Sequence, residues 1–302
     1  MKPLALATLA LTFVVVVVGA YVRLSDAGLG CPDWPLCYGR PIPEKLADAA
    51  ADAKAWKEMG HRYLAGALGI LIFGLVLAAW RTRQSPWLAS AIAALVVFQA
   101  TLGKWTVTML LKPAIVVAHL AGGMALLALL VWFFLARQSY PGKPEARALR
   151  IPALLALVVL SVQILLGGWV SANYAALACP DLPLCLGQAV PPMDFANAFH
   201  VLRELGRTDG GELLPQAALT AIHWSHRVFA LVVVGVVGWA AFRATRTFRG
   251  LGVAIAALLL LQFALGVASV AFGLPLALAA AHNAGAAALL ASLVVLNFFS
   301  WS

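Results

Sequence analysis

Long apolar stretches, separated by shorter polar segments, recur along the whole chain. Eight of them occur, at about residues 4–22, 62–80, 87–107, 114–136, 151–171, 217–241, 250–271 and 277–299. Each reaches the roughly 18 to 20 residues that an α-helix needs to cross the hydrocarbon core of a bilayer. The pattern therefore predicts an all-α membrane protein with eight transmembrane helices.

The first apolar stretch also resembles a secretory signal, because Lys2 precedes it. It is longer than the roughly 7 to 15 residues of a signal's apolar core. Residues 19–23, Gly-Ala-Tyr-Val-Arg, offer no small-x-small cleavage site. We therefore expect this stretch to remain in the protein as a membrane span.

The composition agrees with a membrane protein. Of the 302 residues, 63% are apolar and only 11% are charged, whereas a soluble domain carries about 25% charged residues. A chain with so few charges must keep most of its surface away from water.

The net charge of +9 is distributed unevenly over the predicted loops. With the N-terminus inside, the inner segments are the two termini, 81–86, 137–150 and 242–249. They hold one acid, Glu145, and ten basic residues: Lys2, Arg81, Arg83, Arg137, Lys143, Arg147, Arg150, Arg243, Arg246 and Arg249. The remaining basic and acidic residues balance on the opposite side. This positive-inside pattern predicts a bacterial inner-membrane protein with both termini cytoplasmic and the long loops outside. The charge gives no reason to expect nucleic-acid binding.

The two halves of the chain repeat each other. Residues 19–37 align without a gap with residues 167–185, an offset of 148. Downstream, Glu58-Met-Gly-His61-Arg62 matches His223-Trp-Ser-His226-Arg227 at an offset of 165, and Ala118-His119 matches Ala281-His282 at 163. The change from 148 to 165 places an insertion of about 17 residues near 186–215. Several matches in one order indicate a tandem duplication.

The duplication predicts the domain organisation. Residues 1–136 form an N-terminal half and residues 151–302 a C-terminal half, as two tandem pseudo-symmetric four-helix bundles. An even number of spans gives the halves one orientation, related by an axis along the membrane normal. Residues 137–150, with prolines, a glycine and four basic residues, form a cytoplasmic linker.

All four cysteines fall in the two long outer loops. Disulfides persist on that side of the membrane, and four cysteines allow three pairings. The pairs within each loop, Cys31–Cys37 and Cys179–Cys185, are the simplest, and a zinc site built from all four is the alternative. Residues 43–57, rich in Ala, Lys, Asp and Glu, predict a surface helix that runs into the second span.

Four of the six histidines occupy matching positions, His61 with His226 and His119 with His282. Each half therefore offers two imidazoles at similar depth, from helices that a four-helix bundle can bring together around a cavity. A single intramembrane histidine can be a satisfied polar residue, but a pair repeated in both halves favours a ligand site. His200 lies in the insertion without a counterpart, and we expect it at the surface.

Two imidazoles per half favour haem over other metal centres. Zinc takes three or four protein ligands, and a non-haem iron site needs two histidines and a carboxylate, which only the first half could supply. Haem iron is satisfied by two axial imidazoles. The chain contains no Cys-x-x-Cys-His, so covalent attachment is excluded. Arg62 and Arg227, each beside a histidine, could pair with propionates or serve as interfacial anchors.

Glu58 is the position at which the two halves differ. It lies three residues before His61, on the same helical face, and its match in the second half is His223. A carboxylate beside a haem edge could accept a proton or stabilise a developing cation. The alternative is an ordinary acid near a helix N-terminus, favoured by the helix dipole. A di-iron site is excluded because it needs at least four carboxylates.

In combination these residues resemble the haem A synthase family: eight spans in duplicated halves, Glu58-x-x-His61-Arg62, His119, His226, His282 and the paired loop cysteines. Residues 19–37 closely resemble the first outer loop of that family. The resemblance covers essentially the whole chain.

The resemblance implies an oxidoreductase that converts a ring methyl of haem O to a formyl by successive hydroxylations, with water as the oxygen source. The product, haem A, serves terminal oxidases. It also implies that His226 and His282 hold a haem b cofactor, with Arg227 beside them.

For the first half the resemblance implies that His61 and His119, with Arg62, bind the substrate haem, and that Glu58 is catalytic. The loop cysteines form disulfides in many members. The implied partners, besides membrane lipid, are the haem O synthase that supplies substrate and the oxidase assembly factors that receive product.

The main alternative is a non-enzymatic di-haem b protein that transfers electrons in the membrane. It explains the four histidines equally well but gives Glu58 no role. A haem transporter would also use membrane histidines.

Overall fold

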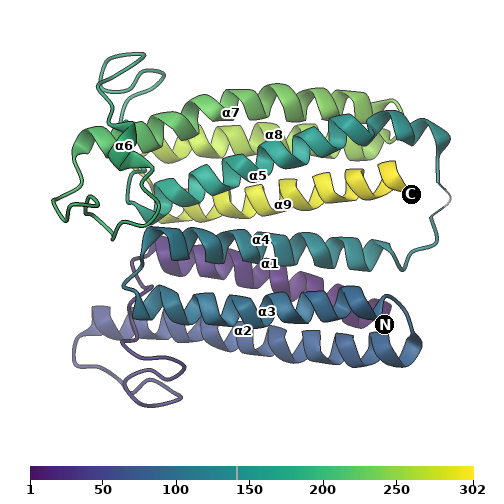
Figure 1. The fold of residues 1–302 in the computed structure, drawn as a ribbon, viewed down its shortest axis with the longest axis horizontal. Helices are drawn as coiled ribbons and strands as arrows, with labels where there is room; N and C mark the ends of the chain where they lie inside the picture. The colour runs from purple at the N-terminus through teal and green to yellow at the C-terminus, as the bar shows by residue number, and fades with distance from the viewer. Residues whose placement is uncertain (141) are drawn as a thin grey trace. The chain divides into compact units, whose positions relative to one another are not determined.

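The computed structural model describes residues 1–140 and 142–302, and eight long helices make up most of it (Figure 1). They are α1 Lys2–Leu24, α2 Ala49–Thr82, α3 Pro86–Thr108, α4 Pro113–Leu135, α5 Arg150–Ala172, α7 Gln216–Thr245, α8 Arg249–Ala271 and α9 Leu276–Trp301. All eight are long and apolar enough to cross a membrane. The predicted all-α membrane class and its eight spans are confirmed.

Two short helices were not predicted. The 3-10 helix η1, Pro144–Leu149, lies in the expected linker, and α6, Phe195–Ala198, lies in the insertion. Over the described residues the backbone forms isolated β-bridges but no strand. His200 follows α6 with 38% of its side chain exposed, and its Nε2 lies 3.7 Å from Oδ1 of Asp209.

The helix predicted over residues 43–57 begins later than expected. Residues 43–48 are not helical, and α2 begins at Ala49 and continues without a break into the second span. The side chain of Asp48 accepts a hydrogen bond from the backbone N–H of Ala50, at 2.9 Å. An aspartate in this position caps the free N–H groups at the start of a helix, so Asp48 fixes the start of α2.

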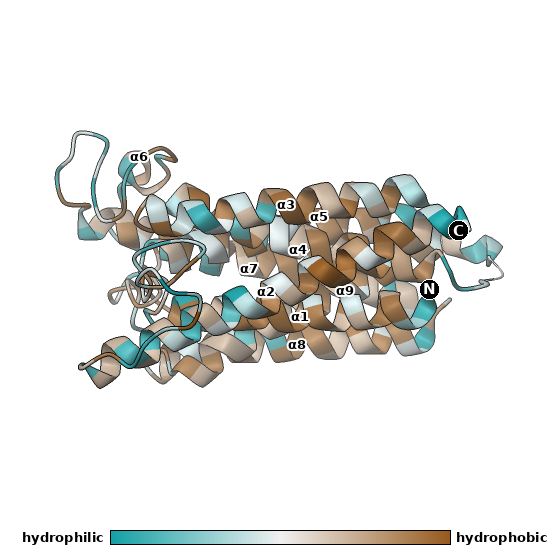
Figure 2. Cartoon of the chain, turned by 90° about the horizontal axis from the view of Figure 1, so that it is seen from below, coloured by the Kyte–Doolittle hydropathy of each residue, from teal (hydrophilic) through white to brown (hydrophobic). Residues whose placement is uncertain are grey.

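Large apolar side chains lie on the outer surfaces of the long helices. Ile70, Trp87 and Leu260 expose 73%, 76% and 69% of their surface. Figure 2 shows hydrophobic residues along the helices and hydrophilic residues at their ends and in the loops. Surfaces of this kind suit contact with lipid and would be a liability in water.

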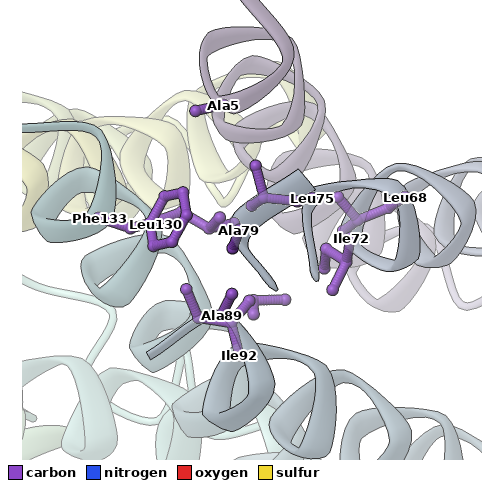
Figure 3. Close-up of a cluster of buried hydrophobic side chains, with 10 residues drawn as sticks. Ala5, Leu68, Ile72, Leu75, Ala79, Ala89, Ile92, Leu130 and Phe133 are labelled. Atoms are coloured by element: carbon purple, nitrogen blue, oxygen red, sulfur yellow. The ribbon is translucent and has the colours of Figure 1, made fainter. Parts of the chain in front are cut away.

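The chain divides into two compact units. The first contains Met1–Leu111 and Ala118–Ser139, and the second contains Lys112–Val117 and Tyr140–Ser302. In the first unit α2 packs on α1 and on α3. A buried cluster joins Ala5 of α1, Ile72 and Leu75 of α2, Ile92 of α3 and Phe133 of α4 (Figure 3).

Small residues allow this close packing. Ala5, Ala79 and Ala89 in the cluster are all fully buried. Lipid is as apolar as leucine, so helices in a membrane associate through van der Waals contact, which small residues at the interface improve.

The second unit has its own packed helices. Helix α5 packs on α7 and α9, and α8 packs on both α7 and α9. The buried amide of Asn297 in α9 donates to the backbone oxygen of Ala153 in α5, at 2.9 Å. A hydrogen bond between helices of this kind fixes their register where no water competes.

Candidate functional site

The four cysteines form two disulfides, Cys31–Cys37 and Cys179–Cys185. The predicted pairing within each loop is confirmed. The zinc alternative is wrong, because oxidised cysteines have no thiolate to offer a metal. Among the described residues, no group of three or more His, Cys, Asp or Glu could hold a metal ion.

The two disulfide loops share one local structure. In the first, the carboxylate of Asp33 accepts from the N–H groups of Tyr38 and Gly39, at 2.7 and 2.9 Å. The turn needs a glycine, because Gly39 has a φ of +75°. These contacts close the loop tightly around its disulfide.

The second loop repeats this arrangement. Asp181 accepts from the N–H groups of Leu186 and Gly187, at 2.7 and 2.8 Å. Gly187 has a φ of +72°. The N–H of Gly187, together with that of Leu186, holds the pKa of the Asp181 carboxyl below its usual value.

Each loop is fastened to its unit by the arginine that follows the helical histidine. Nη1 of Arg62 donates to the backbone oxygens of Asp33 and Leu36, at 2.9 and 2.6 Å. Arg227 donates in the same way to the oxygen of Asp181, at 2.8 Å. The two roles expected for these arginines, propionate partner and interfacial anchor, stay predictions beside these contacts.

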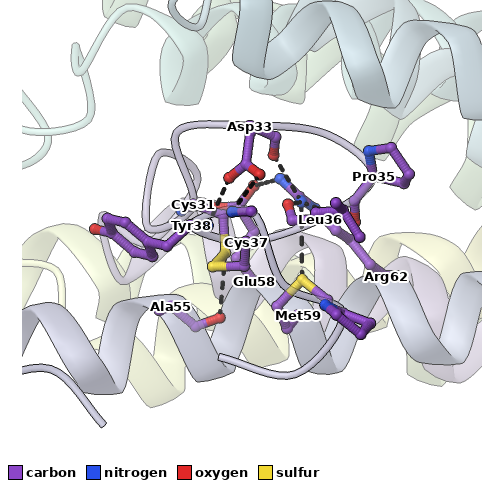
Figure 4. Close-up of a disulfide and its surroundings, with 12 residues drawn as sticks. Cys31, Asp33, Pro35, Leu36, Cys37, Tyr38, Ala55, Glu58, Met59 and Arg62 are labelled. Carbon is purple, nitrogen blue, oxygen red and sulfur yellow. Dashed lines mark hydrogen bonds and ion pairs between the residues drawn. A yellow bond between two sulfur atoms is a disulfide. The ribbon is translucent and has the colours of Figure 1, made fainter. Parts of the chain in front are cut away.

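Glu58 joins the first disulfide loop to α2 (Figure 4). Its Oε2 accepts from the backbone N–H of Cys31 at 2.7 Å, and its Oε1 lies 2.5 Å from Nη2 of Arg62. The Glu58 residue is only 5% exposed. A charge in such a position needs a paired cation and hydrogen bonds to offset its desolvation, and Arg62 and Cys31 supply both.

His223 takes the place of Glu58 in the second unit. Its Nδ1 accepts from the backbone N–H of Cys179, at 3.1 Å. Both halves therefore use this helical position to bind the first cysteine of the loop, through a carboxylate in one and an imidazole in the other. The two halves therefore differ in the residue at this position but share the hydrogen bond that it accepts.

The four matched histidines face glycines on neighbouring helices. His61 lies against Gly19, His119 against Gly103, His226 against Gly167 and His282 against Gly266. A Cβ atom placed on these glycines would lie 2.9, 3.5, 3.0 and 3.0 Å from Cε1 of the facing ring. At Gly19, Gly167 and Gly266 a Cβ atom would crowd the facing imidazole, whereas at Gly103 it would make an ordinary van der Waals contact.

The two histidines of each unit also lie near each other. The rings of His61 and His119 are close enough to interact electrostatically, and so are those of His226 and His282. Within the described part of the chain, the Nδ1 atom of all four rings is buried and has no hydrogen-bond partner. A buried polar atom without a partner is costly, and the same cost occurs at every matched position.

Two glutamines lie beside the histidines of the second unit. The amide nitrogen of Gln262 is 3.3 Å from Nε2 of His282, and that of Gln163 is 3.5 Å from Nε2 of His226. Gln262 has a match in the first half, Gln99, whereas the residue matching Gln163 is Val15. The second unit therefore has one more polar group at its histidine pair.

The residues present fit a haem in each unit. The donor set is two imidazoles, each with an unpartnered Nδ1, and each ring lies against a glycine that carries no side chain. Two axial imidazoles complete the coordination of haem iron. His61 and His119 would hold a haem in the first unit, and His226 and His282 in the second.

The sequence pattern identified the histidines but missed their surroundings. The facing glycines, the glutamine amides and the contacts of the two arginines with the loops emerged only in the structure. A signal for part of this is present in the repeat. Gln99 and Gly103 stand four residues apart, as Gln262 and Gly266 do, and this spacing puts each pair on one helical face.

Known proteins resemble this chain over nearly its whole length. The family model described as COX15-CtaA, cytochrome oxidase assembly protein, matches residues 2–294. A haem A synthase of Shewanella oneidensis is 40% identical, covering 97% of this chain and 94% of the relative. Haem A synthases of Caulobacter vibrioides and Rhizorhabdus wittichii are 30% and 29% identical, covering 97% and 94% of this chain and 92% and 89% of each relative.

Proposed function

Because the chain belongs to the COX15-CtaA family of cytochrome oxidase assembly proteins, we propose that it is a haem A synthase that oxidises a ring methyl of haem O to a formyl. It is an enzyme of haem A biosynthesis, and the oxidoreductase chemistry is the proposed part. One observation carries the proposal. Both units contain the same imidazole pair facing glycines, and within the described residues only the first unit adds a buried carboxylate on the same helix.

The two units have different roles in the proposed reaction. We assign the substrate haem to His61 and His119, because the carboxylate of Glu58 is in that unit. We assign a resident haem b to His226 and His282, where Gln163 and Gln262 contact the rings. When bound, haem b supplies a redox centre that can accept electrons removed from the substrate.

The reaction needs a group that handles protons and positive charge near the methyl. The first hydroxylation is R–CH3 + H2O → R–CH2OH + 2H+ + 2e−, and its repetition gives a gem-diol that loses water to form R–CHO. Removing electrons from the methyl develops positive charge on a carbon conjugated with the ring. A carboxylate held in a low-dielectric site stabilises such charge and can take a proton from the attacking water.

Arg62 prepares Glu58 for this task. The ion pair at 2.5 Å and the N–H of Cys31 keep the carboxylate in one place on α2, one helical turn from His61. A preorganised charge spends no energy on reorientation when the reaction occurs. Arg62 itself is fixed by the loop carbonyls, so the disulfide loop, the arginine and the carboxylate form one assembly.

The setting of the reaction follows from the same assignment. The eight apolar helices indicate an integral membrane protein. We propose the bacterial inner membrane, with both termini in the cytoplasm and the disulfide loops outside. By analogy with the family, haem O synthase would supply the substrate and oxidase assembly factors would receive the product.

The pigment content of the purified protein tests the proposal against a di-haem electron carrier. The protein should be expressed with a haem O source, and its haems extracted and separated by chromatography. A synthase contains haem b together with haem O, a hydroxylated haem or haem A. Haem b alone, at two per chain, would support the electron carrier and refute the synthase.

A further inference from the structure

The insertion, residues 186–215, folds onto the end of the second unit that carries the disulfide loop. Helix α6 lies beside the start of α7 (Figure 1). Ala198 of α6 is fully buried, and Met193, Phe199 and Leu214 are partly buried around it. Beneath them lie residues of α5 and α7: Trp169, Val170, Ala218, Ala221 and Ile222. The insertion is thus a packed structure rather than an open loop.

Arg203 fastens the insertion to α5. It is 2% exposed, and its Nη2 donates to Oδ1 of Asn173 at 2.5 Å. Asn173 in turn donates to the backbone oxygen of Trp169, at 2.8 Å. Nε1 of Trp169 donates back to the oxygen of Ala198, at 2.8 Å. The guanidinium lies 5.7 Å from the centre of the Trp169 ring, so a closed circuit of contacts joins the two segments.

The burial of Arg203 is costly for a connecting loop. Within the described residues no carboxylate lies at ion-pairing distance from it, and burial lowers the pKa of its guanidinium. Burying a charge costs several kcal/mol unless hydrogen bonds and partners offset the lost hydration, and Arg203 has only neutral partners. The first half connects the matching spans with about 17 fewer residues, so the connection alone does not require the insertion.

The covered layer lies next to the histidine pair. Trp169 is two residues beyond Gly167, the glycine that faces His226. Ile222, which is 1% exposed, precedes His226 by one helical turn. The insertion therefore packs on residues of α5 and α7 that lie within about one helical turn of Gly167 and His226.

The first unit has no such cover. The residue matching Trp169 is Tyr21, which is partly exposed and has Nζ of Lys57 5.3 Å from its ring centre. The residue matching Asn173 is Ser25, and nothing in the shorter loop of residues 38–48 matches Arg203. Among the described residues, the first unit therefore lacks the contacts that hold the insertion on the second unit.

We propose that the insertion is a retention cap, fastened by Arg203, that slows the release of haem from the second unit while the first unit exchanges its haem freely. The inference rests on the proposed function, which places a resident haem behind the cap and a substrate in the open unit. Arg203 is a positioning residue here, since it acts through Trp169 and α6 and need not touch the haem.

Haem transfer from the purified full-length protein to excess apomyoglobin, followed by the change in the Soret band, tests the cap. In Arg203→Ala the haem b held by His226 and His282 should leave roughly tenfold faster or more, the change expected when a hydrogen bond to a charged group no longer has to break. Arg207→Ala is the matched control, because Arg207 lies in the same insertion but is exposed. It should release haem at the wild-type rate.

A general loss of stability would accelerate release from both units, whereas loss of the cap accelerates it from the second unit only. Equal acceleration at both sites, or an unchanged rate in Arg203→Ala, would overturn the cap. If Arg203→Ala does not fold, Trp169→Phe removes the indole N–H that donates to Ala198, reduces the ring that faces Arg203, and should accelerate release in the same unit. If His226→Ala leaves the haem b content unchanged, the proposed haem site fails, which is a separate result from failure of the cap.

Discussion

The substitution Glu58→His separates a catalytic carboxylate from a structural one. The second unit already contains the product of this change, because His223 accepts the N–H of Cys179 through Nδ1 at 3.1 Å. A histidine at position 58 should bind the N–H of Cys31 in the same way. It removes only the negative charge and the pair with Arg62.

The structural cost of this change should be modest. Breaking a buried ion pair costs about 3–5 kcal/mol when the remaining charge has no other partner. Arg62, however, keeps its bonds to the oxygens of Asp33 and Leu36 at 2.9 and 2.6 Å. We therefore expect a loss nearer the ~1.5–3 kcal/mol of one hydrogen bond to a charged group, and the protein should fold and keep its haem b.

Glu58→His should reduce the rate of the reaction more severely than it reduces the stability of the fold. Losing one preorganised electrostatic interaction with the transition state costs about 3–4 kcal/mol, or roughly 10² to 10³ in rate. Glu58→His, expressed with a haem O source, should therefore contain haem O or a partly oxidised haem and little haem A by chromatography. The reciprocal His223→Glu is the control and should still produce haem A. Wild-type haem A production by Glu58→His would show that the residue only holds the loop.

Three further outcomes follow from the structure. His226→Ala should remove the low-spin haem b spectrum, because one imidazole cannot complete six-coordinate iron. His61→Ala should keep that spectrum and abolish the production of haem A. The opposite pattern would reverse the assignment of the two units. Because the inner segments are basic, an impermeant maleimide should label Asp209→Cys in intact cells and Arg246→Cys only after permeabilisation. The native cysteines do not interfere, because they are oxidised. The reverse labelling pattern would invert the topology. The lowered pKa of the Asp181 carboxyl contributes stability that is present above the unfolded pKa of about 4 and is lost as the pH falls through the folded pKa. Amide exchange in the Asp181 loop, relative to intrinsic rates, should therefore accelerate in acid. Asp181→Asn should remove that acid-dependent change.

The spans were predictable because they depend on hydrophobicity and length alone, and lipid imposes both. The disulfide pairing was predictable because six residues separate each pair and the loops repeat. The start of α2 was misplaced because composition favours a helix over residues 43–57, whereas the cap at Asp48 sets where it begins.

The contacts of Arg62 and Arg227 could not be read from the sequence. Each arginine binds carbonyl oxygens about 26 to 48 residues earlier in the chain. Backbone oxygens carry no sequence signal, and only the folded loop brings them to the guanidinium. The contacts of Arg203 could not be predicted either, because the insertion has no matching segment in the other half.

In the proposed function the first unit carries out the oxidation of haem O. The most direct measurement is conversion by the purified protein, loaded with haem O and supplied with a chemical electron acceptor in 18O-labelled water. We expect a hydroxylated haem and then haem A, with the label in the newly formed hydroxyl of the first product. Haem O recovered unchanged, from protein whose haem b is intact and is oxidised by the added acceptor, would contradict the proposed function.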